Sequence, residues 1–162
     1  MEKPRVYIET TIPSAYFDLR RDPAMVARRD ATRRWWATAS ERYTLVTGST
    51  VLEELMNGPI QRRGDWLTLI AGVPVLALTP AVRAVVEEYL RQKLMPSRRP
   101  ADAEHLAFAS YYRCEYLLTW NLKHLANANK SGHIQRVNRI LGLFVPRIVT
   151  PSFLLGEARG TR

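Results

Sequence analysis

Short apolar segments alternate with longer amphipathic segments from one end of the chain to the other. The short segments are rich in β-branched and aromatic residues and are bounded by polar residues, glycine or proline, which is the pattern of buried strands. They predict strands over Arg5–Ile8, Tyr43–Thr47, Val73–Leu78, Glu115–Trp120 and Phe144–Val149. The longer segments carry apolar residues at helical spacing. They predict helices over Met25–Ala39, Val51–Asn57, Gln61–Ala71, Ala81–Lys93 and His133–Leu141, a further helix from Pro100, and short helical turns at Pro13 and Leu122–Leu125.

This alternation predicts a fold of the α/β class. Strands separated by helices argue for a parallel sheet that is covered on both faces. Pro146 in the last strand indicates an edge position, because proline cannot donate a ladder hydrogen bond. Residues 127–132 are polar and predict a loop. We find no internal repeat or domain boundary, so we expect one domain over residues 1–155 and a flexible C-terminal tail over residues 156–162.

The segment from Pro100 to Asn121 predicts a helix that leads directly into a strand. Pro100 suits the first helical turn, and Asp102 follows it where a carboxylate meets the positive end of the helix dipole. The strand ends in Thr119-Trp120-Asn121, which places polar side chains at its carboxyl end. Ligands bind at that end in open α/β sheets. We therefore expect Asp102 and Asn121 to share one crevice.

The composition indicates which kinds of molecule the protein binds and in which compartment we expect it. The chain has 162 residues, 46% of them hydrophobic, and a formal net charge of +9, which favours a polyanion such as nucleic acid, an acidic protein or an anionic membrane. Cys114 is the single cysteine, so we expect neither an internal disulfide nor a cysteine-based metal site. The sequence shows no apolar run of membrane-spanning length and no signal peptide, which predicts a cytoplasmic protein.

Four polar residues are candidates for chemistry: Glu9, Glu54, Asp102 and Asn121. They fall at strand ends or on helices that we expect near the same end of the sheet. Gathering three carboxylates in one cleft is unfavourable unless a cation or protons offset the repulsion. Oxygen ligands without cysteine favour Mg²⁺ or Mn²⁺ over zinc. Such an ion on a basic protein suits hydrolysis of phosphodiesters, although each acid taken alone is more often a helix cap or a surface charge.

Four segments carry a resemblance to a known family: Val6–Thr11, Ser49–Leu55, Asp102 with His105, and Leu117–Asn121. In this order and spacing the chain resembles PIN-domain proteins, in particular toxin nucleases of the VapC type. The resemblance implies a three-layer α/β/α sandwich with a central, mainly parallel sheet and a Mg²⁺- or Mn²⁺-dependent endoribonuclease. It also implies a homodimer and a cognate antitoxin. It assigns catalysis to Glu9, Glu54, Asp102 and Asn121, and metal binding to Glu9, Glu54 and Asp102.

Two positions depart from the family pattern. The first acid of the family is usually aspartate and here it is Glu9, whose extra methylene a bridging water could absorb. The fourth is usually aspartate and here it is Asn121, which lowers the negative charge of the site by one. Metal affinity should fall unless Glu53, Glu104 or Glu115 compensates, and we expect Glu104 to point elsewhere and Glu115 to lie at the far end of its strand. We therefore expect a three-acid site that holds a single metal weakly.

Residues around this site are candidates for RNA contacts: Arg98, Arg99, His124, Thr10 and Thr119. The arginine pair can equally be a solvated loop, and the threonines can orient acids or water, or be ordinary strand-end residues. His105 is expected to be a surface or packed histidine, whereas for His124 a phosphate contact and a structural role remain equal alternatives.

Two other functions compete with catalysis. A PIN-fold module that binds RNA or protein and has weakened or lost its catalysis would also explain the departures at Glu9 and Asn121. A nucleotide-binding enzyme on a Rossmann-like sheet is disfavoured, because no glycine-rich loop follows the first strand.

Overall fold

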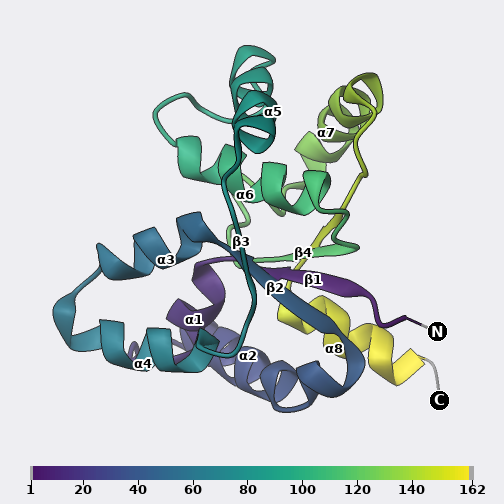
Figure 1. Ribbon diagram of the computed structural model, residues 1–162. Coiled ribbons are helices and arrows are strands. Elements are labelled where there is room, and N and C mark those ends of the chain that lie inside the picture. The colour runs from purple at the N-terminus through teal and green to yellow at the C-terminus, as the bar shows by residue number, and fades with distance from the viewer. Residues whose placement is uncertain (1, 161–162) are drawn as a thin grey trace.

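A parallel five-stranded sheet forms the centre of the molecule in the computed structural model, which describes residues 2–160 (Figure 1). Its strands are β1 (Arg5–Ile8), β2 (Thr44–Gly48), β3 (Val75–Leu76), β4 (Tyr116–Leu118) and β5 (Arg147–Val149). Their order across the sheet is β3-β2-β1-β4-β5, and every neighbouring pair is parallel. The prediction of a parallel sheet is therefore confirmed, as is the edge position of the last strand.

The strand order reverses direction at β1, which has β2 on one side and β4 on the other. Tyr7 of β1 lies opposite Val46 of β2 and opposite Leu117 of β4. The chain thus moves outward from β1 to β3 and then returns to build the other half of the sheet from β4. A crevice opens at the carboxyl ends of the strands where such a reversal occurs, and ligands bind there.

Helices cover both faces of the sheet. Figure 1 shows α5, α6 and α7 above it and α1, α2 and α8 below it, with α3 and α4 to one side. Their bounds are α1 (Thr11–Tyr16), α2 (Pro23–Arg42), α3 (Ser49–Met56), α4 (Ile60–Ile70), α5 (Pro80–Arg91), α6 (Pro100–Tyr111), α7 (Ala128–Leu141) and α8 (Pro151–Gly160). Among the described residues, no helix is both long and apolar enough to cross a bilayer.

Alternate side chains along the strands feed two separate hydrophobic cores. Tyr7 and Leu117 pack into the core under α5, α6 and α7, together with Phe108. Their neighbours Ile8 and Leu118 point to the other face and pack under α2 and α8. The period-two alternation of strand side chains produces this division, and it confirms the three-layer α/β/α sandwich.

Helix α7 begins earlier than its sequence pattern predicts. Residues 127–132 were expected to form a loop, but α7 starts at Ala128. The side chain of Asn127 accepts a hydrogen bond from the backbone N–H of Asn129, so Asn127 serves as the N-cap. The segment 122–125 forms turns instead of the expected short helix.

The end of the chain also differs from expectation. Residues 156–160, which we assigned to a flexible tail, continue α8, and residues 161–162 lie outside the described part. Leu154 of this helix is 1% exposed and packs with Trp35 of α2 in the lower core. Residues 156–160 resemble a tail in sequence because they are Gly-Glu-Ala-Arg-Gly, whereas the buried residues of α8, Pro151 and Leu154, precede them.

Candidate metal centre

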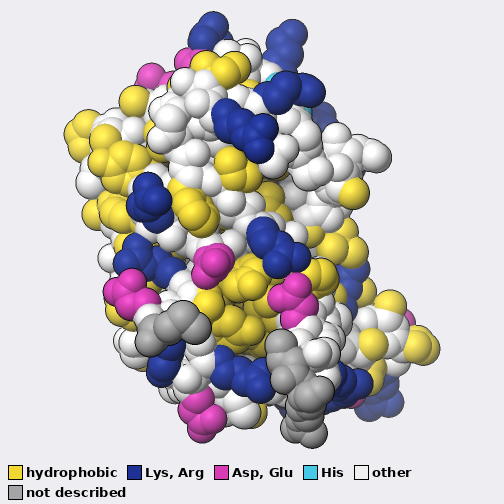
Figure 2. All heavy atoms as spheres, turned by 90° about the vertical axis from the view of Figure 1, so that its right-hand side faces the viewer, with side chains coloured by type: hydrophobic (Ala, Val, Ile, Leu, Met, Phe, Trp, Pro, Cys, Tyr) yellow, Lys and Arg dark blue, Asp and Glu magenta, His cyan; other side chains and the backbone are white. Residues whose placement is uncertain are grey.

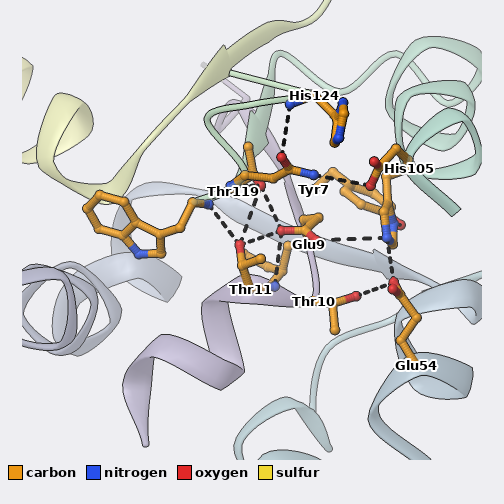
Figure 3. Close-up of polar contacts among 12 residues, drawn as sticks. Tyr7, Glu9, Thr10, Thr11, Glu54, His105, Thr119 and His124 are labelled. Carbon is orange, nitrogen blue, oxygen red and sulfur yellow. Dashed lines mark hydrogen bonds and ion pairs between the residues drawn. The ribbon is translucent and has the colours of Figure 1, made fainter. Parts of the chain in front are cut away.

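Glu9 follows β1 directly and is 3% exposed. One of its oxygens, Oε2, accepts hydrogen bonds from the backbone N–H of Thr11 (3.0 Å), from the Thr11 hydroxyl and from the Thr119 hydroxyl (2.7 Å) (Figure 3). The Thr11 hydroxyl in turn accepts the backbone N–H of Trp120 at 2.8 Å. The ends of β1 and β4 are therefore tied together around one carboxylate, and that carboxylate has little freedom to move.

Glu54 approaches the same place from α3. Its Oε1 accepts hydrogen bonds from the Thr10 hydroxyl and from Nε2 of His105, both at 2.6 Å. Burial works to raise the pKa of Glu54, but the hydrogen bond and charge of His105, with the help of Thr10, outweigh it and lower that pKa. Glu54 is consequently held ionised at neutral pH.

His105 lies between the two glutamates and is fully buried on α6. Its Nε2 is 2.6 Å from Oε1 of Glu54 and 3.9 Å from Oε1 of Glu9, and its Nδ1 is 2.8 Å from the hydroxyl of Tyr7 (Figure 3). Burial works to lower the pKa of His105, but the hydrogen bond to Glu54 and the surrounding carboxylates outweigh it, so that pKa is raised. One ligand atom from each of the three residues lies within 4.8 Å of the others.

Asp102 and Asn121 form a second pair beside this cluster. The side-chain amide of Asn121 donates to Oδ1 of Asp102 at 3.1 Å, as expected for residues that share a crevice. The amide oxygen of Asn121 accepts the backbone N–H of His124, and its own backbone N–H donates to the Thr119 hydroxyl. The other Asp102 oxygen, Oδ2, is buried without a hydrogen bond and lies 3.9 Å from Nε of Arg99.

The predicted set of metal ligands is therefore only partly reproduced by the compact cluster. Glu9 and Glu54 come together as predicted, but His105 occupies the third place in the cluster, with Asp102 next to it. Asp102 remains close enough for its charge to act on His105. The signal for His105 was present in the sequence, because a residue three positions after Asp102 on a helix lies on the same face.

The carboxylates of this site fit a hard divalent cation. Glu9, Glu54 and Asp102 each use one oxygen for hydrogen bonds from the protein. Within residues 2–160 the second oxygen of each accepts no hydrogen bond: Oε1 of Glu9, Oε2 of Glu54 and Oδ2 of Asp102. Anchored carboxylates with one uncommitted oxygen suit Mg²⁺ or Mn²⁺, which prefer oxygen ligands and keep several waters.

The expected RNA contacts fall into two groups. Thr119 is fully buried and Thr10 is bound to Glu54, so these hydroxyls orient the acids, and the assignment of Thr119 to RNA contact is wrong. Arg98 and Arg99 are exposed at the entry to α6, where contact with RNA stays a prediction. His124 is 7% exposed. Burial lowers the pKa of His124; the charge of Asp102 opposes this change, and the charges of Lys130, Arg99 and Lys123 add to it.

The remaining acids do not complete the cluster. Burial raises the pKa of Glu104, against the charge of His105 and with the help of the charge of Glu53, and Glu104 is not one of the three residues of the compact cluster. Glu115 lines a hollow with Lys3 and Arg5 at the opposite ends of the strands, as predicted. On the face that carries the N-terminus, Lys and Arg side chains are interspersed with Asp and Glu (Figure 2), so the basic charge there forms no continuous stripe.

A groove of about 550 Å³ lies away from the acids, between α7 and the edge strand β5. Its walls include Leu122, Ile134, Ile148 and Phe153, and it contains none of the candidate ligands. The candidate ligands therefore lie outside this groove, and Glu9 is bound between the ends of β1 and β4.

Comparison with known proteins supports the fold. No protein-family model matches the chain, and no curated protein matches its sequence. Among solved structures, it is similar to a chain of VapBC2 from Rickettsia felis, crystallised with a DNA fragment from their promoter. The two chains share 11% identity, the alignment covers 90% of this chain and 98% of that one, and the TM-score is 0.55. At this identity the likeness is one of fold, and it confirms the predicted PIN-like α/β/α architecture.

Proposed function

We propose that the protein is a divalent-metal-dependent endoribonuclease and the toxin of a type II toxin–antitoxin pair. The observation that carries this proposal is the cluster of Glu9, Glu54 and His105 near the carboxyl ends of the central strands. Asp102 is near enough for its charge to act on His105, and in each of the three acids one carboxylate oxygen accepts no hydrogen bond from the described residues. The similarity to a VapBC2 chain supports the same function at the level of the fold.

The residues of the site would have different roles in hydrolysis. A bound Mg²⁺ or Mn²⁺ would polarise a phosphoryl oxygen and lower the pKa of a water. Glu9, fixed by Thr11 and Thr119, and Glu54, fixed by Thr10, would hold the ion with Asp102. Asn121 keeps Asp102 in place through its amide. The exposed Arg98 and Arg99 would bind the RNA backbone, which makes binding weaken as salt rises.

Cleavage of RNA by the purified protein tests the proposal. We expect cleavage with Mn²⁺ or Mg²⁺ that stops in EDTA, because the carboxylates alone cannot neutralise the phosphodiester. Asp102→Ala should abolish RNA cleavage, whereas Asp65→Ala, which changes an exposed acid of α4, should leave cleavage unchanged. Activity that persists both in EDTA and in Asp102→Ala would refute the nuclease.

The proposal includes two protein partners. A cognate antitoxin, which would block the cleft, suits the net charge of +9 if it is acidic. A homodimer follows from the resemblance to VapC-type proteins. Purification with the product of the adjacent reading frame, followed by mass measurement in solution, tests the antitoxin and the homodimer. A protein that stays monomeric and does not bind that product contradicts both.

A second function is a PIN-fold module that binds RNA or protein without catalysis. It is favoured by Asn121, because an amide in place of a fourth carboxylate leaves the site less negative than four acids would. Calorimetric titration with Mn²⁺ separates the two. Binding that is present in the native protein and absent in Glu54→Ala would count against the module.

Asn121→Asp should tighten Mn²⁺ binding while destabilising the metal-free protein. The substitution adds a negative charge and removes the amide that donates to Asp102 at 3.1 Å, so two carboxylates face each other. We expect the metal-free protein to lose about 1 kcal/mol in its free energy of unfolding, in the range for a lost buried hydrogen bond. Calorimetry and urea unfolding measure the two effects. Unchanged Mn²⁺ affinity would show that residue 121 does not face the metal.

A further inference from the structure

A buried chain of hydrogen bonds runs from the centre of the sheet to the candidate metal site. It begins at the hydroxyl of Tyr7 on β1, passes through Nδ1 and Nε2 of His105, and ends on Oε1 of Glu54 (Figure 3). We propose that Tyr7 and His105 are positioning residues that hold the carboxylate of Glu54 towards Glu9, an inference that rests on the proposed metal site. Neither residue needs to touch the substrate in this role.

The ionised carboxylate of Glu54 can only accept a hydrogen bond, so Nε2 of His105 carries a proton, and the Tyr7 hydroxyl matches this arrangement at Nδ1. When this hydroxyl donates to Nδ1, the neutral ring must be protonated on Nε2, and that N–H points at Glu54. The doubly protonated ring also donates from Nε2. The hydrogen bond to Glu54 therefore has the same direction in both protonation states, and the positioning does not depend on a titration.

The side chain of Glu54 needs restraint by hydrogen bonds more than that of Glu9 does. The side chain of Glu54 is 39% exposed, whereas that of Glu9 is 4% exposed and fixed by backbone and hydroxyl donors from two strand ends. An exposed glutamate loses considerable rotamer freedom when it is held in one place. His105 and the Thr10 hydroxyl supply that restraint from one side, which leaves Oε2 of Glu54 free.

The hydroxyl of Tyr7 is itself held firmly. The Tyr7 ring is fully buried and stacks on Phe108, with ring centroids 5.8 Å apart and planes inclined by 17°. Gly48 of β2 passes so close that a Cβ there would lie 2.5 Å from the Tyr7 hydroxyl. Burial and the nearby carboxylates raise the pKa of Tyr7 well above its ordinary value, so it stays a hydroxyl.

Two matched tyrosines test the proposal. Tyr7→Phe and Tyr89→Phe each remove one buried hydroxyl with a hydrogen bond, but the hydroxyl of Tyr89 binds Asn138, which has no contact with the acids. Calorimetry should show Mn²⁺ affinity falling about 10-fold or more in Tyr7→Phe, and staying within about twofold in Tyr89→Phe. Urea unfolding on both variants shows that each is folded.

Substitution of His105 itself provides a rescue test. His105→Gln can still donate to Glu54 from its amide, whereas His105→Leu fills similar space without a donor. We expect Mn²⁺ affinity to be largely kept in His105→Gln and to fall by about 10- to 100-fold in His105→Leu.

The outcomes separate this proposal from the nuclease. Equal Mn²⁺ affinities in Tyr7→Phe and Tyr89→Phe, or equal losses in His105→Gln and His105→Leu, overturn the positioning role and leave the nuclease in place. If the native protein binds Mn²⁺ and the variants lose affinity as expected, but the native protein does not cleave RNA, the nuclease is refuted and the positioning role is supported. Native protein that binds no Mn²⁺ overturns both.

Discussion

Glu54→Gln is expected to reduce metal-dependent RNA cleavage by more than about 100-fold, beyond the loss typical of a residue that only supports a ligand. Glutamine keeps the size of the side chain but removes its charge. The Thr10 hydroxyl and Nε2 of His105 both meet Oε1 at 2.6 Å, so the amide oxygen can keep these two contacts while the NH2 group replaces Oε2, the oxygen proposed to face the metal. The initial rate of cleavage at saturating Mn²⁺ measures the effect.

The neighbouring residue supplies the control. Glu53 is exposed on the same helix and points about 100° away from Glu54. Glu53→Gln changes the net charge by the same amount, so it should leave the rate unchanged. Similar losses in the two variants would mean that general electrostatics of α3, and not a ligand at Glu54, governs cleavage.

Gly48→Ala is expected to lower the free energy of unfolding by about 2–3 kcal/mol, as overpacking of a dense core does. Gly48 has φ −107°, which any residue adopts, so its role is to leave space. A Cβ at this position would lie 2.5 Å from the Tyr7 hydroxyl and 2.6 Å from two carbons of the Phe108 ring. Both rings are fully buried and cannot move aside without displacing other core side chains.

Gly64→Ala is the matched control for this steric effect. Gly64 lies inside α4, and a Cβ there would meet nothing within 4 Å. Alanine should therefore stabilise the protein by about 1 kcal/mol through its higher helix propensity. Urea unfolding of the two variants at one pH gives both values, and equal values would contradict the close packing of β2 against Tyr7.

The sequence pattern predicts the architecture well because each face of the sheet leaves its own period in the sequence. The run Val6–Ile8 is apolar because β1 is central and covered on both faces. Pro146 directly precedes β5, which lies at the edge of the sheet, where the loss of a backbone donor is tolerated. The pattern fails at the end of α8, where residues 156–160 are polar or small and were assigned to a tail although they continue the helix.

The site is predictable only as far as strand ends can be located. Glu9 and Asn121 follow strands, so their shared edge follows from the topology. For His105 the sequence shows only that it shares a helix face with Asp102. Its partners Tyr7 and Glu54 lie on β1 and α3, and one sequence does not show which interior side chains face each other across layers. The metal ligation and RNA contacts of these residues remain predictions.

The central place of β1 has a consequence for synthesis on the ribosome. Glu9 is translated early, but the Thr119 hydroxyl that helps to fix it is 110 residues away along the chain. At typical rates of about 5–20 residues per second, the first strand must wait several seconds or more for its neighbour β4 to emerge. A nascent or truncated chain that stops before β4 has only half of the crevice. A chain interrupted before β4 would therefore lack the Thr119 hydroxyl, one of the donors that fix Glu9.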